Sequence, residues 1–129
     1  MSKKLPPPPP YLTEEQERQL VRSAYENFPE AALCFRCDAW SYGDKPGKPF
    51  RFVFVDVEEG GKRHVITEDD AVRGLRVFAR LMSEGRLPGL GLPANYLSPE
   101  DDFSALGDWD GFAFDALAQC AMFGDVIYG

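Results

Sequence analysis

The sequence predicts an α+β domain in which helices pack on an antiparallel sheet of about three strands, in the order α-β-β-β-α-α. Three observations predict this class: amphipathic stretches with helix-capping residues, alternating apolar segments between them, and Gly- or Pro-rich turns at the boundaries. The chain has 129 residues and is 44% hydrophobic, enough for one core without metal or disulfide support. We expect a proline-rich arm over residues 1–12 and a single domain over residues 13–129.

The first helix is expected over about residues 13–28. Thr13-Glu-Glu-Gln16 has the form of a capping box, and apolar residues then follow one helical stripe until Pro29. From Ala32 the chain alternates, which predicts a strand. One face of that strand is apolar, and the other is mixed, with Cys34, Arg36, Asp38, Trp40 and Tyr42.

Residues 43–49 are dense in Gly and Pro and predict a surface hairpin loop. The next strand, residues 50–57, alternates Phe and Val, so both of its faces are apolar, which favours a central position in the sheet. A turn over residues 58–61 leads into a shorter third strand over residues 62–67.

A second helix is expected to begin after Thr67, which is followed by three carboxylates suited to a helix N-terminus, and to end at Gly85. Residues 86–98 show no periodicity and predict a loop. A third, largely buried helix is expected over residues 112–123. The tail, residues 125–129, is compatible with a short edge strand.

The order of the first five elements resembles that of the double-stranded-RNA-binding domain. In that family the second helix begins with a basic cluster that contacts phosphates, whereas the corresponding residues here are Glu68, Asp69 and Asp70. The sign of the charge is inverted. The resemblance is therefore one of topology, and it does not imply RNA binding.

The formal net charge is −7, from 21 acidic and 14 basic residues. This charge opposes non-specific binding to nucleic acid or to an anionic membrane, and it favours a partner protein with a basic surface. The amino terminus has no apolar stretch of the signal-peptide type, and no run approaches membrane-spanning length. Together with an odd number of cysteines, which predicts free thiols, this composition indicates the cytoplasm.

The three cysteines and the one histidine are candidate metal ligands. Together they form a Cys3His set that could satisfy zinc: Cys34, Cys37, His64 and Cys120. A strand, however, turns the two residues of a CxxC pair to opposite faces, so we expect free thiols and no cofactor. His64 alternates with apolar neighbours and is expected to be structural.

A catalytic role has little support in the sequence. The usual nucleophile, metalloprotease and phosphate-loop motifs are missing. The carboxylates Asp108, Asp110 and Asp115 remain the set through which an enzyme or a calcium site would act. In the simpler alternative, Asp108 or Asp110 caps the last helix.

Several groups are candidates for binding. The acidic clusters would form a carboxylate array that mimics a nucleic-acid backbone if they converged on one side: Glu58–Glu59, Glu68, Asp69, Asp70, Glu100, Asp101 and Asp102. The mixed strand face offers hot-spot residue types in Arg36, Trp40 and Tyr42.

A basic stripe on the second helix, Arg73, Arg76 and Arg80, is expected to be neutralised through the pairs Asp69–Arg73 and Arg80–Glu84. Pro6 to Pro10 should be extended polyproline II, as a plain leader, a strip packed on its own domain, or a ligand for an aromatic groove.

The leading hypothesis is a non-catalytic interaction protein, a regulator or inhibitor that binds another protein. The alternatives are an enzyme or ligand-binding domain that uses the three aspartates, and a structural or assembly component held by the proline arm and the tail. The sequence leaves the partner and the oligomeric state open.

Overall fold

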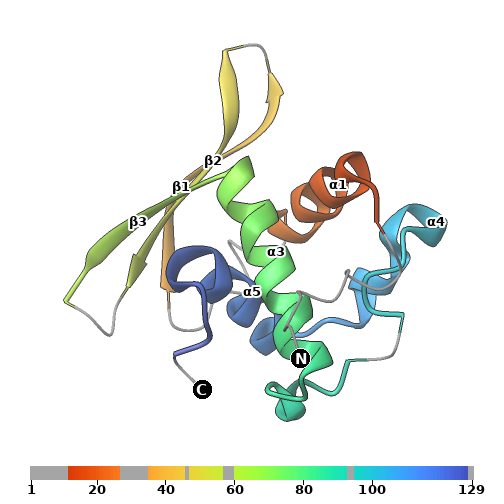
Figure 1. Cartoon of the computed structure of the whole chain (residues 1–129). Helices are drawn as coiled ribbons and strands as arrows, with labels where there is room; N and C mark the ends of the chain where they lie inside the picture. The colour runs from red at the N-terminus through yellow and green to blue at the C-terminus, as the bar shows by residue number, and fades with distance from the viewer. Residues whose placement is uncertain (1–11, 27–34, 46, 57–59, 93–94, 128–129) are drawn as a thin grey trace.

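The computed structural model describes residues 12–26, 35–45, 47–56, 60–92 and 95–127. It confirms the α+β class: helices pack on a three-stranded antiparallel sheet (Figure 1). The longer elements are α1 (Glu14–Tyr25), β1 (Phe35–Lys45), β2 (Lys48–Asp56), β3 (Lys62–Thr67), α3 (Glu68–Ser83) and α5 (Gly111–Phe123). Short helical turns connect α3 to α5: η2 (Pro88–Leu90), α4 (Glu100–Phe103) and η3 (Ser104–Asp108).

The strand order is β1-β2-β3, so β2 is the central strand, as its two apolar faces predicted. Phe50, Phe52 and Phe54 are buried in the core formed with the helices. Val53 and Val55 point the other way and are also buried, but they do not belong to that core cluster. The sheet therefore has a core face and a second face, which we call the open face.

β1 contains a bulge, so the predicted division of its residues between the two faces of the strand is wrong. Cys37 pairs with Phe54 and Ala39 pairs with Val53, so Asp38 is the extra residue. Beyond the bulge the alternation is reversed. Arg36 consequently lies on the open face, whereas Trp40, opposite Phe52, lies on the core face, and the two do not share a face as predicted.

The helix boundaries follow their capping residues. Thr13 and Thr67 each form a capping box with the residue three positions later, as the sequence indicated for α1. Asp110 caps α5 by accepting a hydrogen bond from the Ala113 N–H at 2.9 Å. Gly124 ends α5 in the left-handed conformation, with φ 70°.

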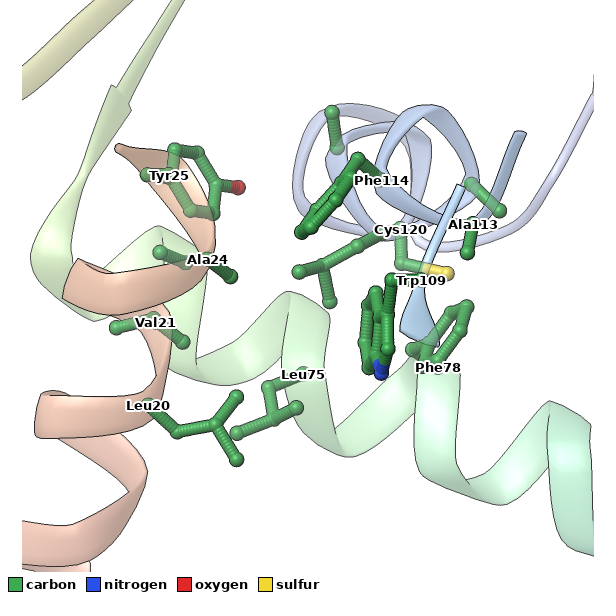
Figure 2. Close-up of a cluster of buried hydrophobic side chains, with 14 of the residues drawn as sticks. Leu20, Val21, Ala24, Tyr25, Leu75, Phe78, Trp109, Ala113, Phe114 and Cys120 are labelled. Atoms are coloured by element: carbon green, nitrogen blue, oxygen red, sulfur yellow. The ribbon is translucent and has the colours of Figure 1, made fainter. Parts of the chain in front are cut away.

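The core joins α1, α3 and α5 (Figure 2). Leu20 and Tyr25 from α1 are fully buried, as are Leu75 and Phe78 from α3. Trp109 packs against Phe78, with ring centroids 5.3 Å apart. The α5 segment is buried almost all round, as its apolar sequence predicted.

Other local predictions are corrected. The hairpin loop is shorter than residues 43–49: Gly43, with φ 72°, lets β1 continue to Lys45, which pairs with Lys48. The helical turns over residues 100–108 were not predicted. Residues 125–127 form no strand, because the Ile127 N–H bonds the Gln119 side chain instead.

Some predictions fall on residues outside the described ranges: the proline tract, the start of the first strand, Cys34, and Glu58–Glu59. None of the helices in the described parts of the chain is long and apolar enough to cross a membrane.

Neither of the two ion pairs predicted within the second helix is found among the described residues: Glu84 pairs with Arg86 rather than with Arg80, and α3 pairs with α1 and at another spacing within itself. Glu17 is buried and accepts two hydrogen bonds from Arg76, at 2.8 and 2.9 Å. Arg73 pairs with Asp70 rather than Asp69, and Asp69 pairs with Arg18. Most of these partners lie on different helices, and Asp70 and Arg73 are three rather than four residues apart. The four-residue spacing used for the prediction therefore did not identify them.

Replacing Arg76 with alanine is expected to lower the free energy of unfolding by about 2 kcal/mol, because the Glu17 carboxylate would remain buried without its two donors. Arg73→Ala removes an arginine from an exposed pair on the same helix, so it should change stability by less than about 0.5 kcal/mol. Urea denaturation followed by circular dichroism measures both. Equal losses of unfolding free energy in the two variants would contradict the assignment of Arg76 as the partner of a buried Glu17 carboxylate.

Alkaline pH should destabilise the fold. Burial raises the pKa of the Cys120 thiol from about 9 to about 12 and that of the Tyr96 phenol from about 10 to about 12. The unfolded chain therefore loses these protons at lower pH than the folded chain does. Stability is complete below about pH 9 and falls as the pH rises from about 9 to 12. Denaturation midpoints at several pH values test this, and Cys120→Ala should make the fall shallower.

Candidate protein-binding surface

Two adjoining clefts lie where the β1–β2 hairpin leaves the body of the domain. The far end of the hairpin projects above the helices in Figure 1. The larger cleft, of about 340 Å³, lies between the hairpin and the first turn of α3 and is lined by Arg22, Gly43, Pro49, Phe50, Arg51, Thr67, Glu68 and Asp69. The smaller, of about 210 Å³, is lined by Ala39, Trp40, Ser41, Gly47, Pro49 and Arg51. We call the two together the hairpin groove.

Trp40 is the large aromatic residue of the hairpin groove. It pairs in register with Phe52, whose ring is fully buried, yet Trp40 itself is 49% exposed. The difference arises from the position of the strand. Trp40 lies on edge strand β1, while the sheet contacts of α3 and α5 are concentrated on β3 at the other edge. An exposed tryptophan beside a cleft is a typical hot spot for binding.

Arg51 connects the two clefts, since it lines both of them. It lies on the open face, opposite Ser41 and Thr67 in the strand register. Its side chain is exposed, and none of the ion pairs found among the described residues includes it. By contrast, Arg22, on the wall of the larger cleft, is held by Glu68.

Gly43 brings the hairpin close to α1. A Cβ at this position would lie 3.6 Å from both terminal nitrogens of Arg22 and 3.0 Å from the Phe50 nitrogen. Its φ of 72° is also one that side chains rarely adopt. Glycine is therefore favoured here by the positive φ and by the close approach of the Phe50 backbone nitrogen, while the Arg22 guanidinium lies at ordinary contact distance.

The open face continues from the groove along the sheet. Three rows of cross-strand neighbours cover it: Ser41–Arg51–Thr67, Ala39–Val53–Val65, and Arg36–Val55–Arg63. In the last row Asp38 pairs with both arginines, at 3.3 Å to Arg36 and 2.8 Å to Arg63. This bridge crosses from β1 to β3, and Val55, on the strand between them, is buried.

Three of the acidic residues predicted as a binding array are engaged with the chain itself. Glu68 pairs with Arg18 and Arg22, and Asp69 pairs with Arg18. Asp70 closes the cap of α3. Figure 1 shows the start of α3 beside the sheet and α4, with its exposed Glu100, Asp101 and Asp102, on the far side of α1. These two clusters do not converge.

The three candidate catalytic aspartates do not form a site in the described part of the chain. Asp108 and Asp110 are exposed, and Asp110 is the cap of α5. Asp115 is buried and accepts a hydrogen bond from the Gln119 amide at 2.8 Å. None of the three lines either cleft.

The described members of the Cys3His set are also separate from one another. Cys37 and His64 flank Phe54 on the two edge strands, while Cys120 lies on α5. His64 packs edge-on against Phe123, with ring centroids 5.1 Å apart. Among the described residues no three His, Cys, Asp or Glu side chains come together as a metal site. Cys37 and Cys120 are free thiols, and burial raises the pKa of Cys37 to about 11.

No protein-family model, curated protein or solved structure matches the chain.

Sequence reasoning selected Trp40 and Arg36, and of the residues that line the larger cleft it selected Glu68 and Asp69, but it missed Arg51, Pro49 and Gly43. Two signals were present. A glycine inside an alternating segment marks a bulge. An arginine in line with Val53 and Val55 marks the place where that face of the strand meets solvent. Which residues come together at the hairpin groove depends on strand register, which the sequence did not specify.

Proposed function

We propose that the chain is a non-catalytic protein-binding domain, a regulator or inhibitor of a cytoplasmic partner, and that the hairpin groove with the adjoining open face is its contact surface. The observation that carries this proposal is the half-exposed Trp40 beside Arg51, which takes part in no ion pair among the described residues. Tryptophan and arginine are the residue types most enriched in binding hot spots. The free thiols of Cys37 and Cys120 suit a reducing compartment.

The shape of the groove favours a protein over a small molecule. Its larger cleft, of about 340 Å³, is at the lower end of the range for small-molecule pockets, and ligand pockets enclose most of their ligand. Here the cleft continues onto an exposed strand face. A surface of this form accommodates the side chains of a bound segment.

The geometry supports the two rival functions less well. Charge mimicry needs unpaired carboxylates gathered on one side, but Glu68 and Asp69 are paired with arginines of α1. An enzyme built on the three aspartates needs them around one cavity, and Asp115 is held inside the domain by Gln119.

The proposal is tested by quantitative affinity capture from lysate of the source cells. Trp40→Ala combined with Arg51→Ala should reduce the recovered partner at least tenfold, because losing two hot-spot side chains removes roughly 2 kcal/mol or more of binding free energy.

Two variants serve as matched controls: Phe112→Ala removes another exposed aromatic residue, and Arg73→Ala removes another exposed arginine. Neither residue lines the hairpin groove. Recovery that is unchanged in the double variant, or equally reduced in the controls, would reject the groove as the contact surface.

A further inference from the structure

We infer that the open face binds an acidic extended segment of a partner protein, with two carboxylates four residues apart and an apolar residue midway between them. This inference rests on the proposed function, because it names the class of partner that the contact surface accepts.

The first argument is the local charge. Among the described residues, the three rows of the open face carry Arg36, Arg51 and Arg63 against one carboxylate, Asp38, in a chain whose net charge is −7. Glu68 and Asp69, which line the larger cleft beside Arg51, are paired with arginines of α1. Asp38 is shared between Arg36 and Arg63, so that row keeps an excess positive charge. The surface is thus complementary to an acidic segment and repels a basic one.

The second argument is spacing. Arg51 and Val55 are four residues apart on β2, which places their rows about 14 Å apart along the strand. Arg36 and Arg63 flank Val55. An extended segment that runs along the strands has the same rise per residue, so its residues i and i+4 reach the two basic rows together. Guanidinium groups bind carboxylates through short, charge-assisted hydrogen bonds.

The third argument is the apolar row that lies between the two basic rows. Ala39, Val53 and Val65 separate the two basic rows, and Val65 is 49% exposed. Side chains i, i+2 and i+4 of an extended segment lie on one face. An apolar residue at i+2 would therefore cover Val65 while the carboxylates at i and i+4 reach the arginines.

The test uses the full chain and a labelled peptide, Gly-Glu-Thr-Val-Thr-Glu-Gly, in fluorescence anisotropy titrations. Saturable binding is expected that weakens steeply between about 0.05 and about 0.5 M salt. Arg51→Gln and Arg63→Gln should each weaken binding roughly fivefold. The control variant Arg73→Gln should bind as the parent does, and circular dichroism checks that each variant is folded.

A second peptide, Gly-Glu-Val-Thr-Glu-Thr-Gly, has the same composition with carboxylates three residues apart, so in an extended chain they point to opposite sides. It should bind at least fivefold more weakly. Equal binding of the two peptides, no binding of the first up to about 1 mM, or equal loss with Arg73→Gln would overturn the inference. Tighter binding of a single-stranded oligonucleotide, or a chain dimer dissociated by Arg63→Gln, would overturn it in favour of those occupants.

The outcome is distinguishable from that of the capture experiment. If capture depends on Trp40 and Arg51 but the peptide neither binds nor competes, the contact surface stands and the acidic segment is rejected. If capture does not depend on these residues, the contact surface itself is rejected.

Discussion

Replacing Gly74 with alanine is expected to lower the free energy of unfolding by about 2–3 kcal/mol. Gly74 lies in α3 where α5 crosses it closely. An added Cβ would lie 2.7 Å from both the Cα and the backbone nitrogen of Ala121. Backbone atoms cannot rotate away as a flexible side chain can, so the two helices would have to separate.

The sign of this effect makes it informative. In an exposed helix interior, alanine in place of glycine stabilises by about 1 kcal/mol. Gly89→Ala is the control, since a Cβ there would meet no atom within 4 Å and should change stability by less than about 0.5 kcal/mol. Urea denaturation compares the two. A Gly74→Ala variant as stable as the parent would show that α3 and α5 do not pack this closely.

Replacing Trp109 with alanine should destabilise the fold by about 3–5 kcal/mol. Trp109 is 6% exposed and packs against Phe78 and Phe114, with centroids 5.3 Å away in each pair. Its indole N–H also donates a buried hydrogen bond to the Tyr96 carbonyl, at 3.2 Å. Alanine would leave a cavity between α3 and α5 (Figure 2).

Trp40→Ala is the matched comparison, because the chain has two tryptophans in opposite environments. Trp40 is half exposed, so its loss should lower stability by less than about 1 kcal/mol. Thermal and urea unfolding of both variants separates the residue that supports the fold from the residue proposed to bind. Equal destabilisation would mean that Trp40 is a core residue and would weaken its assignment to the groove.

The parts of the fold that were predicted correctly depend on local chemistry. Thr13 and Gly124 act within one turn of the chain, so their capping roles could be inferred from the sequence. The Phe–Val alternation of β2 likewise predicted a central strand. What the sequence could not supply was tertiary pairing. The bulge at Asp38 depends on how β1 pairs with β2, and the bond between Arg76 and Glu17 joins α3 to α1. The relative positions of these segments are fixed only on folding.

The candidate site was predicted less well for the same reason. Trp40 and Arg36 were grouped by alternation, and a single extra residue in β1 separates them onto opposite faces. Arg51 belongs to the site through the register of β2 with both neighbouring strands. The sequence predicts exposed charge at the acidic clusters, but Glu68 is partly covered by the arginines of α1.

The most direct test of the proposed contact surface is site-specific photo-crosslinking in the source cells. A photoreactive phenylalanine derivative would replace Trp40 in one variant and Phe112, the most exposed large apolar residue among those described, in another. We predict a discrete protein adduct from position 40 that is absent from position 112 and is lost when Arg51→Ala is added. No adduct from position 40, or the same adduct from both positions, would contradict the assignment of the hairpin groove.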